Sequence, residues 1–222
     1  MKNFKLSPSI LDAKKFSLKK RLKFLASQGV EYIHFDVMDG KFVEKKTFDY
    51  KYLKKFSKFN FKKDVHLMIE NPLEVVEKYA EDGADIITVH YESFANDEDV
   101  IKCLNLIKKC GVKAGLSIKP DTNYNILQRF FPYADLVLVM SVEPGKGGQA
   151  FIGKSYLKIS RIRQMIVESH ASCEIEVDGG INNLNIRKVV DSGATMVVVG
   201  SYLFKAEDFE ENYFELCPGK NI

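Results

Sequence analysis

The chain has 222 residues, 45% of them hydrophobic, and a formal net charge of +3, which provides apolar material for one barrel-sized domain or two small ones. Its lysines occur in short clusters without interleaved aromatic residues, so the sequence indicates no nucleic-acid-binding surface. No apolar run reaches membrane-spanning length, no signal-peptide core follows Lys2, and the four cysteines lack metal-ligand spacing, so we expect a cytoplasmic protein with free thiols.

Eight short segments rich in apolar and β-branched residues are predicted to be strands. In chain order they are residues 5–10, 32–38, 63–69, 86–90, 113–118, 136–141, 174–178 and 196–200. Amphipathic segments predicted to be helices lie between them, including residues 16–28, 72–82, 97–110 and 155–169. Pro72 suits the first turn of its helix, with Asn71 as the cap.

A glycine that can end a helix recurs along the chain. Gly29, Gly83, Gly111 and Gly193 each stand at the end of a predicted helix and precede a small residue and a strand. Their separations are near multiples of about 27 residues, which is the size of one βα unit. Eight such units account for residues 1–222, so we predict a single-domain (β/α)8 TIM barrel in the α/β class; a doubly wound open sheet is the structural alternative.

The second predicted strand carries polar side chains where a buried strand should be apolar. His34, Asp36 and Met38 point to one face of the strand. The alternating apolar residues Ile33, Phe35 and Val37 point to the other. An imidazole and a carboxylate in a core are costly unless they are paired or bind a metal. A structural His–Asp pair that fixes the strand is the alternative to a functional site.

Further polar residues fall near the ends of other predicted strands. His66 lies on the third strand, His90 ends the fourth, and Asp178 ends the seventh. The carboxyl ends of barrel strands form the active site of this fold, so two histidines and two aspartates would converge there. Such a set suits Zn²⁺, Fe²⁺, Mn²⁺ or Co²⁺, and two opposed aspartates could move a proton between the faces of a substrate.

Glycine-rich loops follow the last three strands. Residues 142–149 contain three glycines, Gly179 and Gly180 follow the seventh strand, and Gly200-Ser201 closes the eighth. Glycine lets backbone N–H groups approach an anion, and the loops after strands seven and eight are the usual phosphate site of this fold. The sequence therefore favours a sugar phosphate, although each glycine alone could serve only a tight turn.

Five segments together resemble the ribulose-phosphate 3-epimerase family. They are Ser-Pro-Ser-Ile-Leu at 7–11, His-Phe-Asp-Val-Met-Asp-Gly at 34–40, Asp-Val-His-Leu-Met at 64–68, Val-Met-Ser-Val-Glu-Pro-Gly at 139–145 and Glu-Val-Asp-Gly-Gly at 176–180. The likeness covers nearly the whole chain in the right order.

This resemblance implies interconversion of D-ribulose 5-phosphate and D-xylulose 5-phosphate in the pentose phosphate pathway, through a 2,3-enediolate. It implies that Asp36 and Asp178 exchange the C3 proton and that one divalent metal ion is held by His34, Asp36, His66 and Asp178. The substrate-binding residues that it implies are Ser9, His66, Met38, Met68, Met140, Gly145, Lys146, Gly147, Gly148, Gly179, Gly180, Gly200 and Ser201. It also suggests a homo-oligomer, either a dimer or a hexamer.

The chain departs from the family pattern at two loops. Lys146 stands where an aromatic residue is usual between the glycines of the sixth loop, and residues 41–45 read Lys-Phe-Val-Glu-Lys instead of His-Phe-Val-Pro-Asn. These changes leave open an epimerase of a hexulose 6-phosphate such as D-allulose 6-phosphate. A sugar-phosphate binder without catalysis is a further alternative. A Schiff-base aldolase is disfavoured because no lysine occupies a suitable strand-end position.

Overall fold

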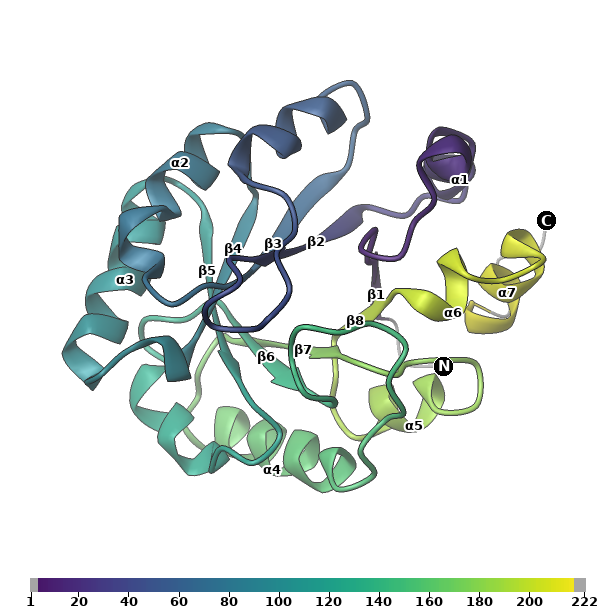
Figure 1. Cartoon of the computed structure of the whole chain (residues 1–222). Helices are drawn as coiled ribbons and strands as arrows, with labels where there is room; N and C mark the ends of the chain where they lie inside the picture. Colours follow the sequence, from purple (N-terminus) through teal and green to yellow (C-terminus); the bar gives the residue numbers. More distant parts are fainter. Residues whose placement is uncertain (1–3, 218–222) are drawn as a thin grey trace.

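The computed structural model describes residues 4–217, in which eight parallel strands form a ring covered by helices (Figure 1). The strands are β1 (Lys5–Pro8), β2 (Tyr32–Met38), β3 (Lys62–Met68), β4 (Ile86–His90), β5 (Lys113–Ile118), β6 (Leu136–Met140), β7 (Glu174–Asp178) and β8 (Met196–Val199). The sheet order is β1-β8-β7-β6-β5-β4-β3-β2, so β2 to β8 pair in the order of the chain and β1 pairs with β8. A doubly wound sheet would reverse its strand order at a switch point, and this one does not. The (β/α)8 TIM barrel is confirmed.

The ring closes between β1 and β2 just beyond Pro8. Ser9 forms a parallel bridge with His34, and the backbone N–H of Ile10 donates to the carbonyl of His34 at 3.3 Å. On the other side, the N–H of Ser9 donates to the carbonyl of Val199 at 3.0 Å. Backbone pairing of the first strand therefore continues to residue 10, as predicted. It brings Ser9 into the barrel mouth beside β2.

The outer layer contains α-helices (α) and 3₁₀ helices (η). They are α1 (Lys15–Ser27), η1 (Tyr50–Phe56), η2 (Pro72–Glu74), α2 (Val76–Glu81), η3 (Tyr91–Ser93), α3 (Asp97–Lys109), η4 (Tyr124–Phe130), α4 (Ser155–Glu168), α5 (Ile186–Asp191), α6 (Ser201–Phe204) and α7 (Phe209–Leu216). Within residues 4–217, no helix has the length and apolar character needed to cross a membrane.

One predicted helix, residues 72–82, is wrong in two respects. It is broken into η2 and α2 because Val75, a β-branched residue, adopts a φ of −128°, outside the helical range. Asn71 does not cap it, since its side chain accepts no hydrogen bond from the first helical turn. Asn96, by contrast, accepts from the N–H of Asp99 at 2.9 Å and caps α3.

The recurring glycines end helices as predicted. Gly29, Gly83, Gly111 and Gly193 have φ values of 71°, 91°, 76° and 123°, which only glycine adopts at little cost. Each one turns the chain from the end of a helix into the next strand. The repeat in the sequence therefore marks real βα units.

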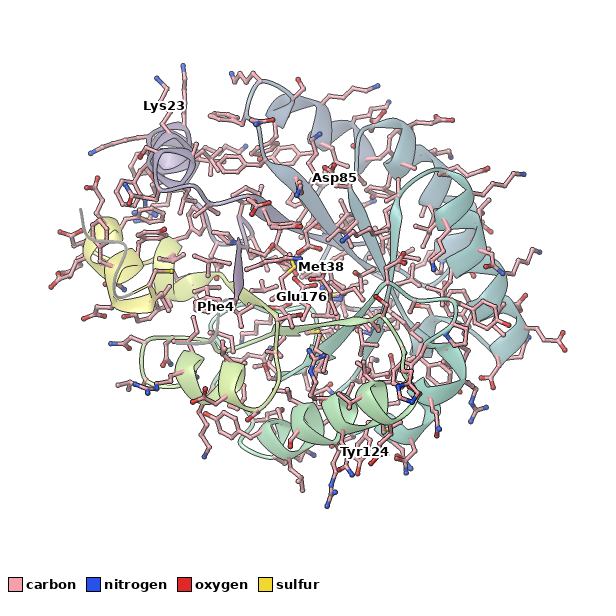
Figure 2. The ribbon with its side chains drawn as sticks, turned by 180° about the vertical axis from the view of Figure 1, so that it is seen from behind. Phe4, Lys23, Met38, Asp85, Tyr124 and Glu176 are labelled. Carbon is pink, nitrogen blue, oxygen red and sulfur yellow. The ribbon has the colours of Figure 1, made fainter. Side chains whose placement is uncertain are left out.

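The two faces of the strands differ in chemistry. The outward face is apolar, as in Ile33, Phe35 and Val37, and it packs into the main hydrophobic core under the helices. The inward face has a smaller apolar cluster, made of Tyr32, Ile86, Leu136, Leu138, Met140, Val142 and Met196. The rest of the barrel interior includes buried polar side chains, namely Ser7, His34, Asp36, Asp64, His66, Thr88, His90, Ser117 and Glu176. Figure 2 shows Met38 and Glu176 near the centre of the ring, where this polar interior lies.

Candidate metal centre and active site

Four predicted ligands come together at the carboxyl end of the barrel interior. Nε2 of His34 lies 3.5 Å from Oδ1 of Asp36 and 3.9 Å from Oδ2 of Asp178. Nδ1 of His66 lies 3.5 Å and 3.8 Å from the same two oxygens. The ligand atoms of this cluster are all within 4.8 Å of one another. Strands β2, β3 and β7 thus bring residues that are far apart in the chain to one point.

The cluster has the donor set and spacing of a metal site. Nε2 of His34 and Nδ1 of His66 are buried and have no hydrogen-bond partner among residues 4–217, a costly state for a polar atom. A tetrahedral ion with ligands at about 2.0–2.2 Å would hold its ligand atoms about 3.4 Å apart. The four nitrogen-to-oxygen distances, 3.5–3.9 Å, are slightly wider than this. The buried His/Asp cluster could therefore bind a borderline divalent ion such as those predicted from the sequence.

The two aspartates of the cluster differ in their electrostatics. Burial, reinforced by the negative charge of Asp36, raises the pKa of Asp178 to about 7. Burial also opposes ionisation of Asp36, but the neighbouring His34 and His66 outweigh it and lower the pKa of Asp36. The protein's own groups therefore keep Asp36 ionised and let Asp178 take up a proton near neutral pH.

On the side away from the cluster, the ring of His34 contacts the carboxylate of Asp64. Its Nδ1 lies 2.6 Å from Oδ2 of Asp64, which also accepts from the hydroxyl of Ser7 at 2.8 Å. Burial opposes the charged imidazole, yet Asp64 and Asp36 together raise the pKa of His34 well above its usual range. Burial and the charge of Asp64 raise the pKa of Glu176 as well, which favours its neutral acid form. Both carboxyl oxygens of Glu176 are buried without a hydrogen-bond partner among residues 4–217.

The sequence reasoning missed Asp64 and Glu176. Each stands two positions before a predicted ligand on the same strand, Asp64 before His66 and Glu176 before Asp178. Strand alternation places them on the inward face, and that signal was available. The prediction was confined to the strand ends, whereas Asp64 and Glu176 approach each other and His34, within 4.8 Å, two residues deeper in the barrel.

His66 is backed by a second imidazole. Its Nε2 lies 2.8 Å from Nε2 of His90, and Nδ1 of His90 lies 3.1 Å from Oε2 of Glu92. Burial is the main influence that lowers the pKa of His66, to about 4, and it also lowers that of His90. Burial opposes ionisation of Glu92, but its contacts with His90 lower its pKa to about 2. His90 was noted as a strand-end histidine; Glu92 was not predicted.

A cavity opens directly above the cluster. Of the four cluster residues only Asp36 and Asp178 line it, so His66, predicted also to contact substrate, lies beneath the lining. The other predicted substrate residues all line it, namely Ser9, Met38, Met68, Met140, Gly145, Lys146, Gly147, Gly148, Gly179, Gly180, Gly200 and Ser201. Asp12 and Gln149 also line it and were not predicted.

The loop after β6 lines this cavity and packs closely on the loop after β7. A Cβ at Gly180 would lie 2.5 Å from the backbone nitrogen of Phe151, so no larger residue fits without moving the chain. The side-chain amide of Gln149 donates to the carbonyls of Glu143 and Lys146 at 2.6 and 2.8 Å and ties the loop to itself. The glycines thus permit close contact between the two loops.

The two unusual loops meet beside the cavity. A Cβ at Gly145 would lie 2.8 Å from Cβ of Val43, so the loops after β2 and β6 touch there. Lys146 lines both the cavity over the cluster and a second hollow, whose other lining residues include Phe42, Lys45 and Lys119. The backbone N–H groups of Lys41 and Phe42 donate to Oδ1 of Asp39, which fixes the start of the first loop.

Comparison with known proteins agrees with this architecture. The chain resembles the solved structure of 3-hexulose-6-phosphate synthase from Salmonella typhimurium with a TM-score of 0.72, at 17% identity and over 96% of each chain. That likeness concerns the fold.

Sequence relatives are closer. The chain is 41% identical over 206 residues to the ribulose-phosphate 3-epimerase of Aquifex aeolicus, covering 92% of this chain and 91% of that protein. It is 40% identical over 220 residues to the enzyme of the same name from Chlamydia pneumoniae, covering 97% and 95%. The family model described as "Ribulose-phosphate 3 epimerase family" matches residues 5–204. The chain therefore belongs to the ribulose-phosphate 3-epimerase family of enzymes.

Proposed function

We propose that this chain interconverts D-ribulose 5-phosphate and D-xylulose 5-phosphate, using Asp36 and Asp178 as the two proton-transfer groups at C3. One observation carries the proposal. These two aspartates belong both to the buried His/Asp cluster and to the lining of the cavity above it. They reach this place from β2 and β7, which are separated by β1 and β8 in the closed ring. A sugar carbon between them would have one carboxyl group on each side.

The reaction requires a proton to leave one face of C3 and another to arrive at the opposite face. One aspartate takes the C3 proton, the C–H electron pair forms the C2=C3 double bond, and negative charge develops on the C2 oxygen. The other aspartate then donates its proton to the far side of C3, which inverts that centre. A divalent ion held by His34, Asp36, His66 and Asp178 would supply Lewis-acid stabilisation of this charge.

Other residues would bind and shield the sugar. Met38, Met68 and Met140 are buried around the cavity and would exclude water beside the developing charge. The hydroxyl of Ser9 donates to Oδ2 of Asp36 at 2.5 Å, which orients that carboxylate. The phosphate group would lie on the backbone of Gly179, Gly180, Gly200 and Ser201, under the loop of Gly145, Lys146, Gly147 and Gly148.

Proton exchange in D₂O tests the proposal directly. Metal-loaded protein incubated with D-ribulose 5-phosphate should incorporate deuterium at C3 and yield D-xylulose 5-phosphate, both measured by NMR. A parallel incubation with D-allulose 6-phosphate tests the hexulose alternative. Binding of the pentulose phosphate without exchange would instead support the binder without catalysis and reject the epimerase.

Substitution of either aspartate should abolish most of the activity. Asp36→Asn and Asp178→Asn each remove one proton carrier, so we expect turnover to fall about 10²- to 10⁴-fold. Asp121→Asn is the matched control, because Asp121 lies far out on the surface with its side chain 81% exposed. Turnover within a few-fold of the unaltered protein in both site variants would contradict the proposed roles. That the protein works as a single-domain, cytoplasmic homo-oligomer, either a dimer or a hexamer, stays a prediction.

A further inference from the structure

A row of three side chains runs from the cluster to the outer rim of the barrel. His66 on β3 contacts His90 at the end of β4, and His90 contacts Glu92 in η3. Both imidazoles are fully buried, and their rings stack with centroids 4.9 Å apart at an interplanar angle of 27°. The row ends on the cluster side at Nδ1 of His66, which has no hydrogen-bond partner in the part of the chain that the structure describes.

Only one arrangement of protons satisfies this row. The backbone N–H of Lys119 donates to Oε1 of Glu92 at 2.8 Å, and a backbone N–H cannot act as an acceptor. The ionised carboxylate of Glu92 is an acceptor too, so Nδ1 of His90 must carry a proton and donate it to Oε2. Neutral His90 then offers a lone pair at Nε2, which accepts the proton of Nε2 of His66. Nδ1 of His66 then carries no proton, and its lone pair faces the cluster.

The far end of the row is rigidly held. Glu92 also accepts from the hydroxyl of Thr122, and the buried ammonium of Lys158 donates to the carbonyls of Lys119, Pro120 and Thr122 at 2.7–3.0 Å. The ring of Phe42 packs on His90 with centroids 4.8 Å apart. The carboxylate and the middle imidazole therefore have little freedom to turn.

We propose that His90 and Glu92 are positioning residues for the metal centre: they hold His66 as the tautomer whose Nδ1 lone pair points at the ion. This inference rests on the proposed function only in that His66 is a ligand. His34 is fixed by the same principle through one direct contact, Nδ1 to Asp64. For His66 the carboxylate is that of Glu92, and it acts through the imidazole of His90. The two histidines consequently present different ring nitrogens to the cluster.

Glu92→Gln provides a test with a defined outcome. The N–H of Lys119 requires the amide oxygen at the Oε1 position, so the NH₂ group would stand opposite Nδ1 of His90. Nδ1 of His90 must then accept, its proton moves to Nε2, and Nε2 of His66 becomes the acceptor. The proton of His66 is thereby placed on Nδ1, where it blocks ligation. One nearly isosteric substitution should therefore reverse the direction of each hydrogen bond in the row.

Histidine tautomers can be read from long-range ¹H–¹⁵N correlations of metal-free protein labelled with ¹⁵N-histidine. In the unaltered protein we expect His66 protonated on Nε2 and bare on Nδ1; in Glu92→Gln we expect the reverse, with the His34 signals unchanged. Affinity for Zn²⁺ and Mn²⁺, measured by competition with a chelator, should fall about 10- to 100-fold. Glu174→Gln is the matched control, because Glu174 pairs with Lys5 and Lys113 at the opposite end of β7.

The outcomes separate this inference from the proposed function. A proton on Nδ1 of His66 in the unaltered protein overturns the inference without any variant, so the test does not depend on whether Glu92→Gln folds. An unchanged His66 tautomer in Glu92→Gln, or an affinity loss no larger than in Glu174→Gln, also overturns it, even if the unaltered enzyme exchanges the C3 proton. If the unaltered protein shows no proton exchange at C3 while the tautomers follow the expectation, the proposed function fails. The positioning role of His90 and Glu92 is then still supported.

Discussion

The inward and outward faces of the same strands perform different tasks. On β2 the outward residues Ile33, Phe35 and Val37 are apolar and pack under the helices, while the inward residues His34 and Asp36 form part of the cluster. The outward face is stabilised by burial of apolar area, which tolerates many side chains of similar size. The inward face depends on individual hydrogen bonds and charges. A substitution on the outward face should therefore change stability with little effect on chemistry, whereas one on the inward face should change the chemistry of the site.

Energetic cost distinguishes the two faces as well. A buried ionisable group that is not fully paired destabilises the folded state, whereas a buried leucine or valine stabilises it. Asp178 and Glu176 both have raised pKa values because burial and a neighbouring carboxylate disfavour their charged forms. The inward face is thus maintained at the expense of stability, and a bound ion would offset part of that cost.

The largest effect is expected from pH in the metal-free protein. The pKa of Asp178 is about 7 in the folded chain, against an ordinary value of 3.8. A raised pKa means that the contribution of this group to stability is complete below pH 3.8 and is lost as pH rises toward 7. With the metal removed by a chelator, the free energy of unfolding relative to Asp178→Asn should therefore fall by about 4 kcal/mol over this range.

Urea unfolding of both proteins at several pH values measures this difference. Added Zn²⁺ provides the control, because an ion favours the ionised carboxylate and should remove the loss of stability at pH 7. A difference that is flat between pH 4 and pH 7 in the metal-free proteins would show that Asp178 is not held in the neutral form.

The same comparison explains what the sequence could and could not predict. The outward face and the helix ends are local: alternation on β2 predicted Phe35 as core, and the glycine at position 29 predicted the end of α1. The ligands were also predictable, because a polar residue in an apolar strand is itself unusual. The partners behind them were not. Asp64 and Glu176 lie within 4.8 Å of each other below the strand ends, and Glu92 accepts a hydrogen bond from the loop after β5. Strand periodicity predicts neither of these proximities.

Leu67→Ala tests the outward face with a smaller effect. Leu67 is fully buried on β3, and its neighbours in the chain, His66 and Met68, point inward. Removing its side chain leaves a cavity under the helix layer and should lower the free energy of unfolding by about 3 kcal/mol. Turnover per folded molecule, measured well below the unfolding midpoint, should stay within about twofold. A stability loss below 1 kcal/mol, or a large drop in turnover, would mean that the two faces are not separable.

Lys146 should give the smallest effect, because it lies in a loop at the mouth rather than on either face of a strand. Lys146 lines the cavity, and its positive charge would attract the phosphate group, but a solvent-exposed charge contributes only about 0.2–1 kcal/mol. Lys146→Ala should therefore raise KM for the pentulose phosphate about two- to fivefold, less so at high salt, with kcat little changed. Lys23→Ala, on the outer side of α1 in Figure 2, is the matched control and should alter neither. A fall in kcat above tenfold at unchanged KM would place this lysine in the chemical step, and the mouth would then have to be counted with the inward face.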